Sequence, residues 1–214
     1  MSHFVGLCFG NYWEDDLEQY SESYEVESYI AYTKEQAIET AIKNHEANYN
    51  YAEKRLKDEN LSTSSYDYYK KIFMRGPSLS AEEAWKHVKE DWGYDIDENE
   101  NLLTNYNPNA TWDWYSIGGR WGGFLSVKEL DEDGDRIETN QTTVGEVDWE
   151  YMMEHKFPPF CYVTEEGEWC EKGEMGWFGI THDEKPEESW RKQFMDYVNS
   201  LDKDCLVTVI DFHI

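Results

Sequence analysis

Residues 205–213 constrain the fold of this 214-residue chain more than any other segment. Its two alternating sets of side chains are both apolar until the final residues: Leu206, Thr208, Ile210 and Phe212 on one face, and Cys205, Val207, Val209, Asp211 and His213 on the other. A strand with two apolar faces has to be covered on both sides. The sequence therefore predicts a central strand of a sheet at the C-terminus.

A second strand is expected at the N-terminus, where residues 3–9 are apolar and rich in β-formers, and another at 26–32, where side chains alternate. No Pro/Gly/Ser-rich linker divides the chain, so we expect one α+β domain over residues 1–214. It should contain a mainly antiparallel sheet of five to seven strands with helices packed on one face. The N- and C-terminal strands should be adjacent in the middle of this sheet, in antiparallel or parallel pairing.

Capping signals predict helices between these strands. Thr33 with Gln36 and Ser80 with Glu83 have the capping-box spacing. The first predicts a long helix over 34–58 and the second a shorter helix that ends near Gly93. The helical segment 34–92 is therefore a candidate insertion or lobe of the domain.

The second half of the chain predicts short elements. Asp148 should cap a short helix and Pro186 should open a longer one. Asp133-Gly134 is a strong hairpin signal, and a second hairpin is expected around Gly167. The hairpin strands are expected at 124–130 with 136–143, and at 160–164 with 168–170.

Charge is the most unusual feature of the composition. The chain has 46 Asp and Glu against 19 Lys and Arg, a net charge of −27, and the acids lie mainly in 1–33, 76–107 and 131–188. Residues 34–75 have 7 acids and 8 bases and could present a small basic face. Such a charge repels nucleic acid and anionic membranes and attracts basic protein surfaces. A surface that only keeps the chain in solution is the alternative.

The segment 107–124 is the densest in unusual residues, with three tryptophans and four glycines in an electrically neutral stretch. One interpretation is a core corner in which Arg120 pairs with Asp113 or another buried acid. The other is a ligand- or partner-binding surface, because Trp, Tyr and Arg dominate binding hot spots. Its candidate residues are Trp112, Asp113, Trp114, Tyr115, Arg120 and Trp121.

The sequence resembles a group of phage-borne and prophage-borne accessory proteins of unassigned function. The resemblance lies in the start at residues 1–4, the core WDWYSIGGRW at 112–121 and the ending at 208–214. It implies that the chain is the product of a small accessory gene of a phage, and we expect the protein in the host cytoplasm. Phage proteins that blunt restriction or CRISPR systems often present carboxylates in place of phosphates, so the resemblance gives the acidity a function.

Catalytic signatures are absent from the sequence. It has no nucleophile elbow, no phosphate-binding loop and no dinucleotide fingerprint, so we expect no enzyme and no cofactor. The four cysteines lack zinc-site spacing and are expected to be reduced. His3, Asp211 and His213 are weak metal-ligand candidates if the terminal strands pair, and a hydrogen-bonded strand end is the alternative.

These observations favour stoichiometric binding. The leading hypothesis is a protein that inhibits a basic host nuclease or nucleic-acid-binding complex by mimicry of nucleic acid, without binding nucleic acid itself. The alternative is a nucleotide or small-ligand binder that uses Arg120 and its neighbouring tryptophans, and the third hypothesis is a metal-dependent hydrolase. No apolar run reaches the ~20 residues that a membrane span requires, and homodimer formation stays open.

Overall fold

The computed structural model describes residues 2–58, 60–156, 158–175 and 180–214. It divides into two compact units. The sheet unit comprises Met1–Glu25 and Tyr106–Ile214, and the helical unit comprises Val26–Asn105, which includes the predicted helical segment 34–92. Helices and mostly antiparallel strands make the protein α+β, as expected.

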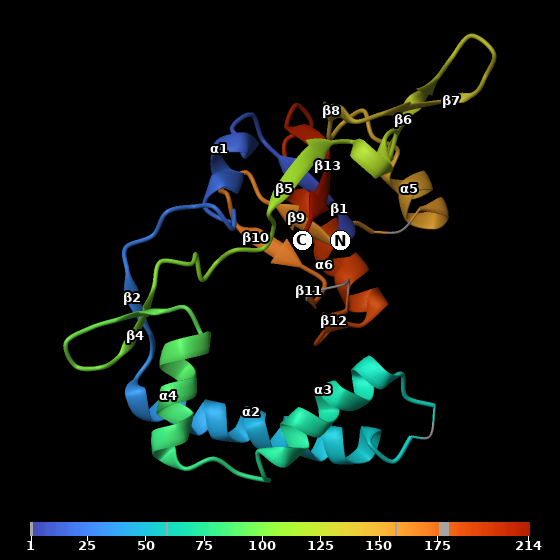
Figure 1. The fold of residues 1–214 in the computed structure, drawn as a ribbon. Coiled ribbons are helices and arrows are strands. Elements are labelled where there is room, and N and C mark those ends of the chain that lie inside the picture. The colour runs from blue at the N-terminus through green and yellow to red at the C-terminus, as the bar shows by residue number, and fades with distance from the viewer. Residues whose placement is uncertain (1, 59, 157, 176–179) are drawn as a thin grey trace. The chain divides into compact units, whose positions relative to one another are not determined.

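The sheet unit is built on a six-stranded sheet with the order β10-β9-β1-β13-β5, in which β8 also pairs with β13. Its strands are β1 (His3–Phe9), β5 (Trp114–Ile117), β8 (Gln141–Thr143), β9 (Cys161–Val163), β10 (Trp169–Glu171) and β13 (Leu206–His213). β1 and β13 lie side by side in the middle (Figure 1) and pair antiparallel, with His3 opposite His213. The predicted central position of both terminal strands is confirmed, and β1 with β9 is a parallel pair within this sheet.

Both faces of β13 are covered. On one face Val207 and Val209 belong to a core that includes residues of α5 (Trp149–His155) and α6 (Glu187–Ser200). On the other face Ile210 and Phe212 pack with α1 (Trp13–Glu18) through Trp13 and Leu17. Helices therefore lie on both faces, whereas the sequence predicted one. The sequence did not predict α1, because this helix has only six residues and three acids separate its two apolar residues.

The predicted hairpin around Gly134 is confirmed as β6 (Leu125–Leu130) with β7 (Arg136–Thr139), and the one around Gly167 as β9 with β10. Residues 141–143 were expected to continue the first hairpin, but they pair with β13 as β8. They do so because β5 covers only Ile210–His213, which leaves Leu206–Thr208 of β13 open to another strand. A 3₁₀ turn, η1 (Gly119–Trp121), and a small sheet of β11 (Glu174–Met175) and β12 (Thr181–His182) complete the sheet unit.

The helical unit contains α2 (Lys34–Arg55), α3 (Thr63–Met74), α4 (Ala81–Asp91) and a small sheet of β2 (Tyr29–Tyr32), β4 (Leu102–Thr104) and β3 (Asp95–Ile96). Both predicted capping boxes are present. Ala41 of α2 packs with Trp85 and Val88 of α4. Tyr49 stacks on Phe73 and Tyr51 contacts Tyr69, so α3 runs back along α2 (Figure 1).

Among the described residues, no helix combines the length and the apolar character that crossing a bilayer requires.

Candidate functional site

The three tryptophans of the segment 107–124 do not share one site. Trp112 is only 9% exposed and packs edge-to-face on Tyr115, with ring centroids 5.2 Å apart. Trp121 is half-buried against the core on the α6 face, whereas Trp114 is 45% exposed. A single pocket lined by all three indoles is therefore not formed.

Two glycines set the geometry of the turn after β5. Gly118 and Gly119 have φ values of 71° and 46°, which lie in the left-handed region that favours glycine. A Cβ on Gly119 would lie 2.4 Å from Asp211 Oδ2 and 2.5 Å from Ser116 Oγ. The turn thereby brings the backbone N–H of Arg120 to Asp211, where it donates to Oδ2 over 2.9 Å.

Arg120 is held through its backbone and not through its side chain. It is exposed, and its guanidinium forms no ion pair within the described part of the chain. The expected pairing of Arg120 with Asp113 is wrong, because the Asp113 carboxylate lies against His213. Asp211 is a buried acid nearby, and it accepts a hydrogen bond from the Arg120 backbone but forms no ion pair with the Arg120 guanidinium among the described residues.

Two histidine–carboxylate pairs lie at the end of the sheet where the chain termini meet. His3 Nδ1 is 3.0 Å from Asp211 Oδ1, and His213 Nδ1 shares a short hydrogen bond with Asp113. The two imidazoles meet edge-to-face, and Trp114 stacks on His213 with ring centroids 5.1 Å apart. The strand pairing that places His3 opposite His213 brings His3, Asp211 and His213 together, as the sequence predicted.

This end of the sheet is a hydrogen-bonded cluster. The Nδ1 atoms of both histidines face carboxylates, and Asp211 uses both of its oxygens. His213 Nε2 is buried without a hydrogen-bond partner. Across the described ranges, no three or more His, Cys, Asp or Glu side chains are grouped so that they could hold a metal ion.

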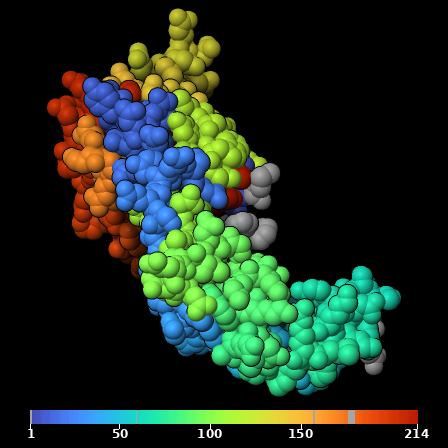
Figure 2. All heavy atoms as spheres, turned by 60° about the vertical axis from the view of Figure 1, so that its left-hand side comes forward, coloured from blue at the N-terminus to red at the C-terminus, as the bar shows by residue number. Residues whose placement is uncertain are grey.

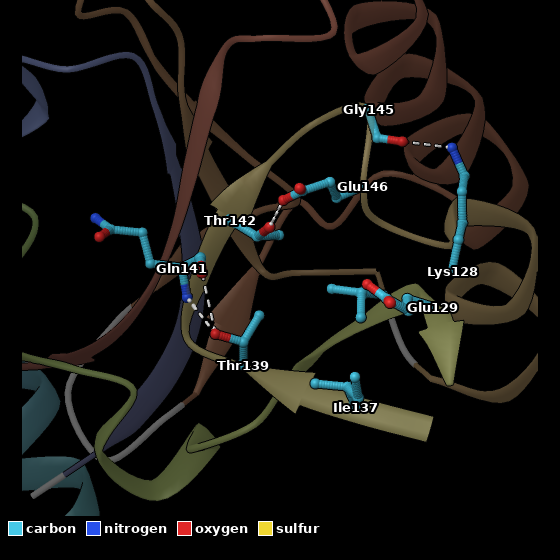
Figure 3. Close-up of a pocket in the computed structure, with 9 residues that line it drawn as sticks. Lys128, Glu129, Ile137, Thr139, Gln141, Thr142, Gly145 and Glu146 are labelled. Carbon is cyan, nitrogen blue, oxygen red and sulfur yellow. Dashed lines mark hydrogen bonds between the residues drawn. The ribbon is translucent and has the colours of Figure 1, made fainter. Parts of the chain in front are cut away.

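A hollow of about 450 Å³ lies beside the β6–β7 hairpin and β8 (Figure 3). Its polar groups bond mainly to one another: Lys128 Nζ donates to Gly145 O, and Thr142 bonds to Glu146. Its lining comprises Val127, Lys128, Glu129, Ile137, Thr139, Gln141, Thr142, Gly145 and Glu146. The hollow therefore offers few unused groups that would orient a ligand.

Three acidic segments meet at the opposite end of the sheet. Gly167 lies against Asp16, since a Cβ on this glycine would be 2.9 Å from Asp16 Oδ1. Glu165 links this turn to the segment 202–204: its backbone N–H donates to the Tyr197 hydroxyl, and its carboxylate lies near Cys205. Burial first, and then Glu165, raise the pKa of the Cys205 thiol to about 11. Figure 2 shows α1 in dark blue beside the orange and red segments on this surface.

We call this surface the acidic rim. It comprises nine carboxylates from the segments 14–18, 165–168 and 202–204: Glu14, Asp15, Asp16, Glu18, Glu165, Glu166, Glu168, Asp202 and Asp204. All are exposed except the half-buried Asp16. None forms an ion pair with a base among the residues that the structure describes, although Lys203 lies within the third segment. Sequence alternation could not reveal the rim, because its three segments are far apart in the chain.

Comparison of the chain with protein families, with curated proteins and with solved structures found no match.

Proposed function

We propose that this protein binds and inhibits a basic nucleic-acid-handling protein of a bacterial host, with the acidic rim taking the place of nucleic-acid phosphates. A restriction or CRISPR-like defence protein is the expected partner. The observation that carries this proposal is the set of nine rim carboxylates, none of which is neutralised by a base of the described chain.

The separation of charge between the two units supports the same proposal. The sheet unit has 30 Asp and Glu against 9 Lys and Arg, whereas the helical unit has 16 against 10. The sheet unit therefore produces most of the negative field. Such a field accelerates association with a basic surface and discriminates against partners of like charge.

The anchoring of the rim is a further support. The turn between β9 and β10 is fixed by the Tyr20 hydroxyl, which donates to Gly167 O over 2.8 Å, and by Tyr197 at Glu165. Trp13 and Leu17 hold α1 in the core. Carboxylates on rigid elements lose little conformational freedom on binding, which favours affinity.

Affinity capture from a bacterial lysate tests the proposal. The tagged chain is incubated with lysate at low and at high salt, and the bound proteins are identified by mass spectrometry. We expect a basic protein that binds duplex DNA on its own, leaves the tagged chain at high salt, and releases DNA when this chain is added. Capture that is insensitive to salt, or a partner that keeps its DNA, contradicts mimicry.

A further inference from the structure

The helical unit contains a hollow of about 380 Å³ between α2, α3 and the end of α4. One face of α2 and one face of α3 line most of it. Each face contributes four residues, counting the C-cap of α3, and their spacings of three, four and seven place them on the same side of each helix. The lining comprises Ala41, Asn44, His45, Asn48, Tyr68, Lys71, Ile72, Arg75, His87 and Trp92. We call this hollow the helical groove.

The charge of the helical groove is opposite to that of the chain. Its lining contains Lys71 and Arg75 and no carboxylate. Neither cation forms an ion pair or a cation–π contact within the described ranges. In a chain with a net charge of −27, two cations one turn apart on one helix face can together bind an anion.

Acids near the helical groove restrict where that anion can lie. An adjoining hollow of about 350 Å³ shares His45, Arg75 and His87, but it is also lined by Glu83, Glu90 and Asp91. His87 is already bonded to Asp91, and His45 to Gly76 O. The anion is therefore expected on the α3 side, between Lys71 and Arg75.

The remaining lining groups suit an aromatic, hydrogen-bonding ligand. Tyr68 meets the Tyr69 ring edge-to-face, with ring centroids 5.3 Å apart, but it is 61% exposed, so a base can stack on the exposed part of its ring. The side-chain amides of Asn44 and Asn48 can each donate and accept hydrogen bonds at a base edge. A volume of about 380 Å³ falls in the range of small-molecule sites, roughly 300–1,000 Å³.

We propose that the helical groove binds a mononucleotide, with its phosphate on Lys71 and Arg75 and its base on Tyr68. A polynucleotide is disfavoured, because every further phosphate would enter the field of the acidic chain. The site is separate from the acidic rim and adds ligand binding to the proposed inhibitor function.

Calorimetric titration of the full chain tests this proposal. The probes are the four ribonucleoside 5′-monophosphates, their nucleosides, inorganic phosphate and a short single-stranded oligonucleotide. We expect at least one monophosphate to bind about tenfold or more tightly than its nucleoside and than inorganic phosphate. The nucleoside lacks the contacts of the phosphate with Lys71 and Arg75, and inorganic phosphate lacks the contacts of the base with Tyr68. No binding by any monophosphate at millimolar concentration overturns the proposal. Equal affinity for phosphate, or tighter binding of the oligonucleotide per site, overturns the mononucleotide assignment.

Exposed side chains of α3 provide matched variants. Lys71→Gln and Arg75→Gln should each weaken the monophosphate by about tenfold or more. Lys70→Gln removes the same charge from the same helix at a position outside the groove, and should change affinity less than about twofold. Equal losses of affinity in Lys70→Gln and Lys71→Gln would mean that the ligand responds only to the overall charge of the helix and not to a contact with Lys71.

Tyr68→Ala tests the position of the base. It should weaken the monophosphate by about fivefold or more through lost stacking while leaving inorganic phosphate unchanged. Unchanged monophosphate affinity in this variant contradicts the proposed orientation. Circular dichroism of each variant verifies that the helices are intact.

Discussion

At the scale of single residues, Gly119 joins the turn after β5 to the buried carboxylate of Asp211. Its φ of 46° is strained for any other residue, and an added Cβ would meet Asp211 Oδ2 at 2.4 Å. Asp211 is only 2% exposed and is fixed by His3 and by the Arg120 N–H, so it cannot move aside without losing these bonds. The packing at this end of the sheet therefore requires glycine.

Gly119→Ala should lower the free energy of unfolding by about 2–4 kcal/mol, through backbone strain and overpacking together. Gly134→Ala is the matched control, because Gly134 has a φ of 85° but no atom within 4 Å of its added Cβ. This variant should lower the free energy of unfolding by only about 1 kcal/mol, from backbone strain alone. Urea unfolding measures both, and equal losses would exclude the steric role of Gly119.

The four cysteines should differ in reactivity. Burial raises the pKa of the Cys8 and Cys161 thiols, and Cys170 is half-buried with a less protected thiol whose pKa burial also raises. Little thiolate therefore forms at neutral pH. We expect slow alkylation by iodoacetamide, with Cys170 labelled first by mass spectrometry. Labelling of Cys8 at the rate of Cys170 would mean that β1 opens from its neighbours.

The residue contacts at the candidate site were predictable only where strand pairing determines them. Pairing of the two terminal strands places His3 opposite His213, and this was predicted from alternation. The bond between Asp113 and His213 was not, because it depends on how β5 enters the sheet. Alternation likewise gave no indication that Trp112 is buried while Trp114 is exposed.

At the scale of elements, α5 depends on one side chain at its start. Asp148 accepts a hydrogen bond from the Tyr151 N–H and pairs with Arg136 at 2.6 Å. The hydrogen bond from the Tyr151 N–H, and to a smaller extent the contact with Arg136, lower the pKa of the Asp148 carboxyl from its ordinary value. A carboxyl with a lowered pKa stabilises the fold above its unfolded-state pKa, and this contribution disappears as the pH falls through the folded-state pKa.

Asp148→Ala should lower the free energy of unfolding by about 1–2 kcal/mol at neutral pH, from loss of the cap. Asp148→Asn keeps a capping side chain and loses only the half-buried ion pair with Arg136, so the free energy of unfolding should fall by about 0.5–1 kcal/mol. The difference between wild type and either variant should shrink on acidification, because protonated Asp148 makes neither charged contact. Unfolding measured from neutral to acidic pH tests this, and a difference independent of pH contradicts the role of the carboxylate.

The elements that sequence patterns predicted are those with strong caps or two apolar faces, such as α2, α4 and β13. α3 was missed because it has no buried residue and because its N-cap, Ser62, is followed at the third position by Ser65 and not by the Glu or Gln of a capping box. α1 was missed because acids surround its two core residues. Local patterns therefore found the elements that bury their own faces, and not those that complete a neighbour's core.

At the scale of the whole molecule, the distribution of charge is the property that most constrains function. The sequence predicts the net charge and its segments, but not which segments converge on one surface. Folding brings residues 14–18, 165–168 and 202–204 to one end of the sheet. In the helical groove it leaves two cations that have no ion-pair partner among the described residues. The mimicry of nucleic acid that we propose depends on the first of these surfaces, the acidic rim, alone.

Displacement of duplex DNA from the captured partner by charge-matched variants tests this claim most directly. The rim variant carries Asp15→Asn, Glu166→Gln and Asp204→Asn, one change in each segment, and the control carries Glu129→Gln, Glu132→Gln and Asp133→Asn on the β6–β7 hairpin. Each variant removes three exposed carboxylates that form no ion pair within the described part of the chain. We expect about tenfold weaker displacement by the rim variant and little change in the control. Equal effects of the two variants would contradict it, because net charge and not the acidic rim would then govern binding.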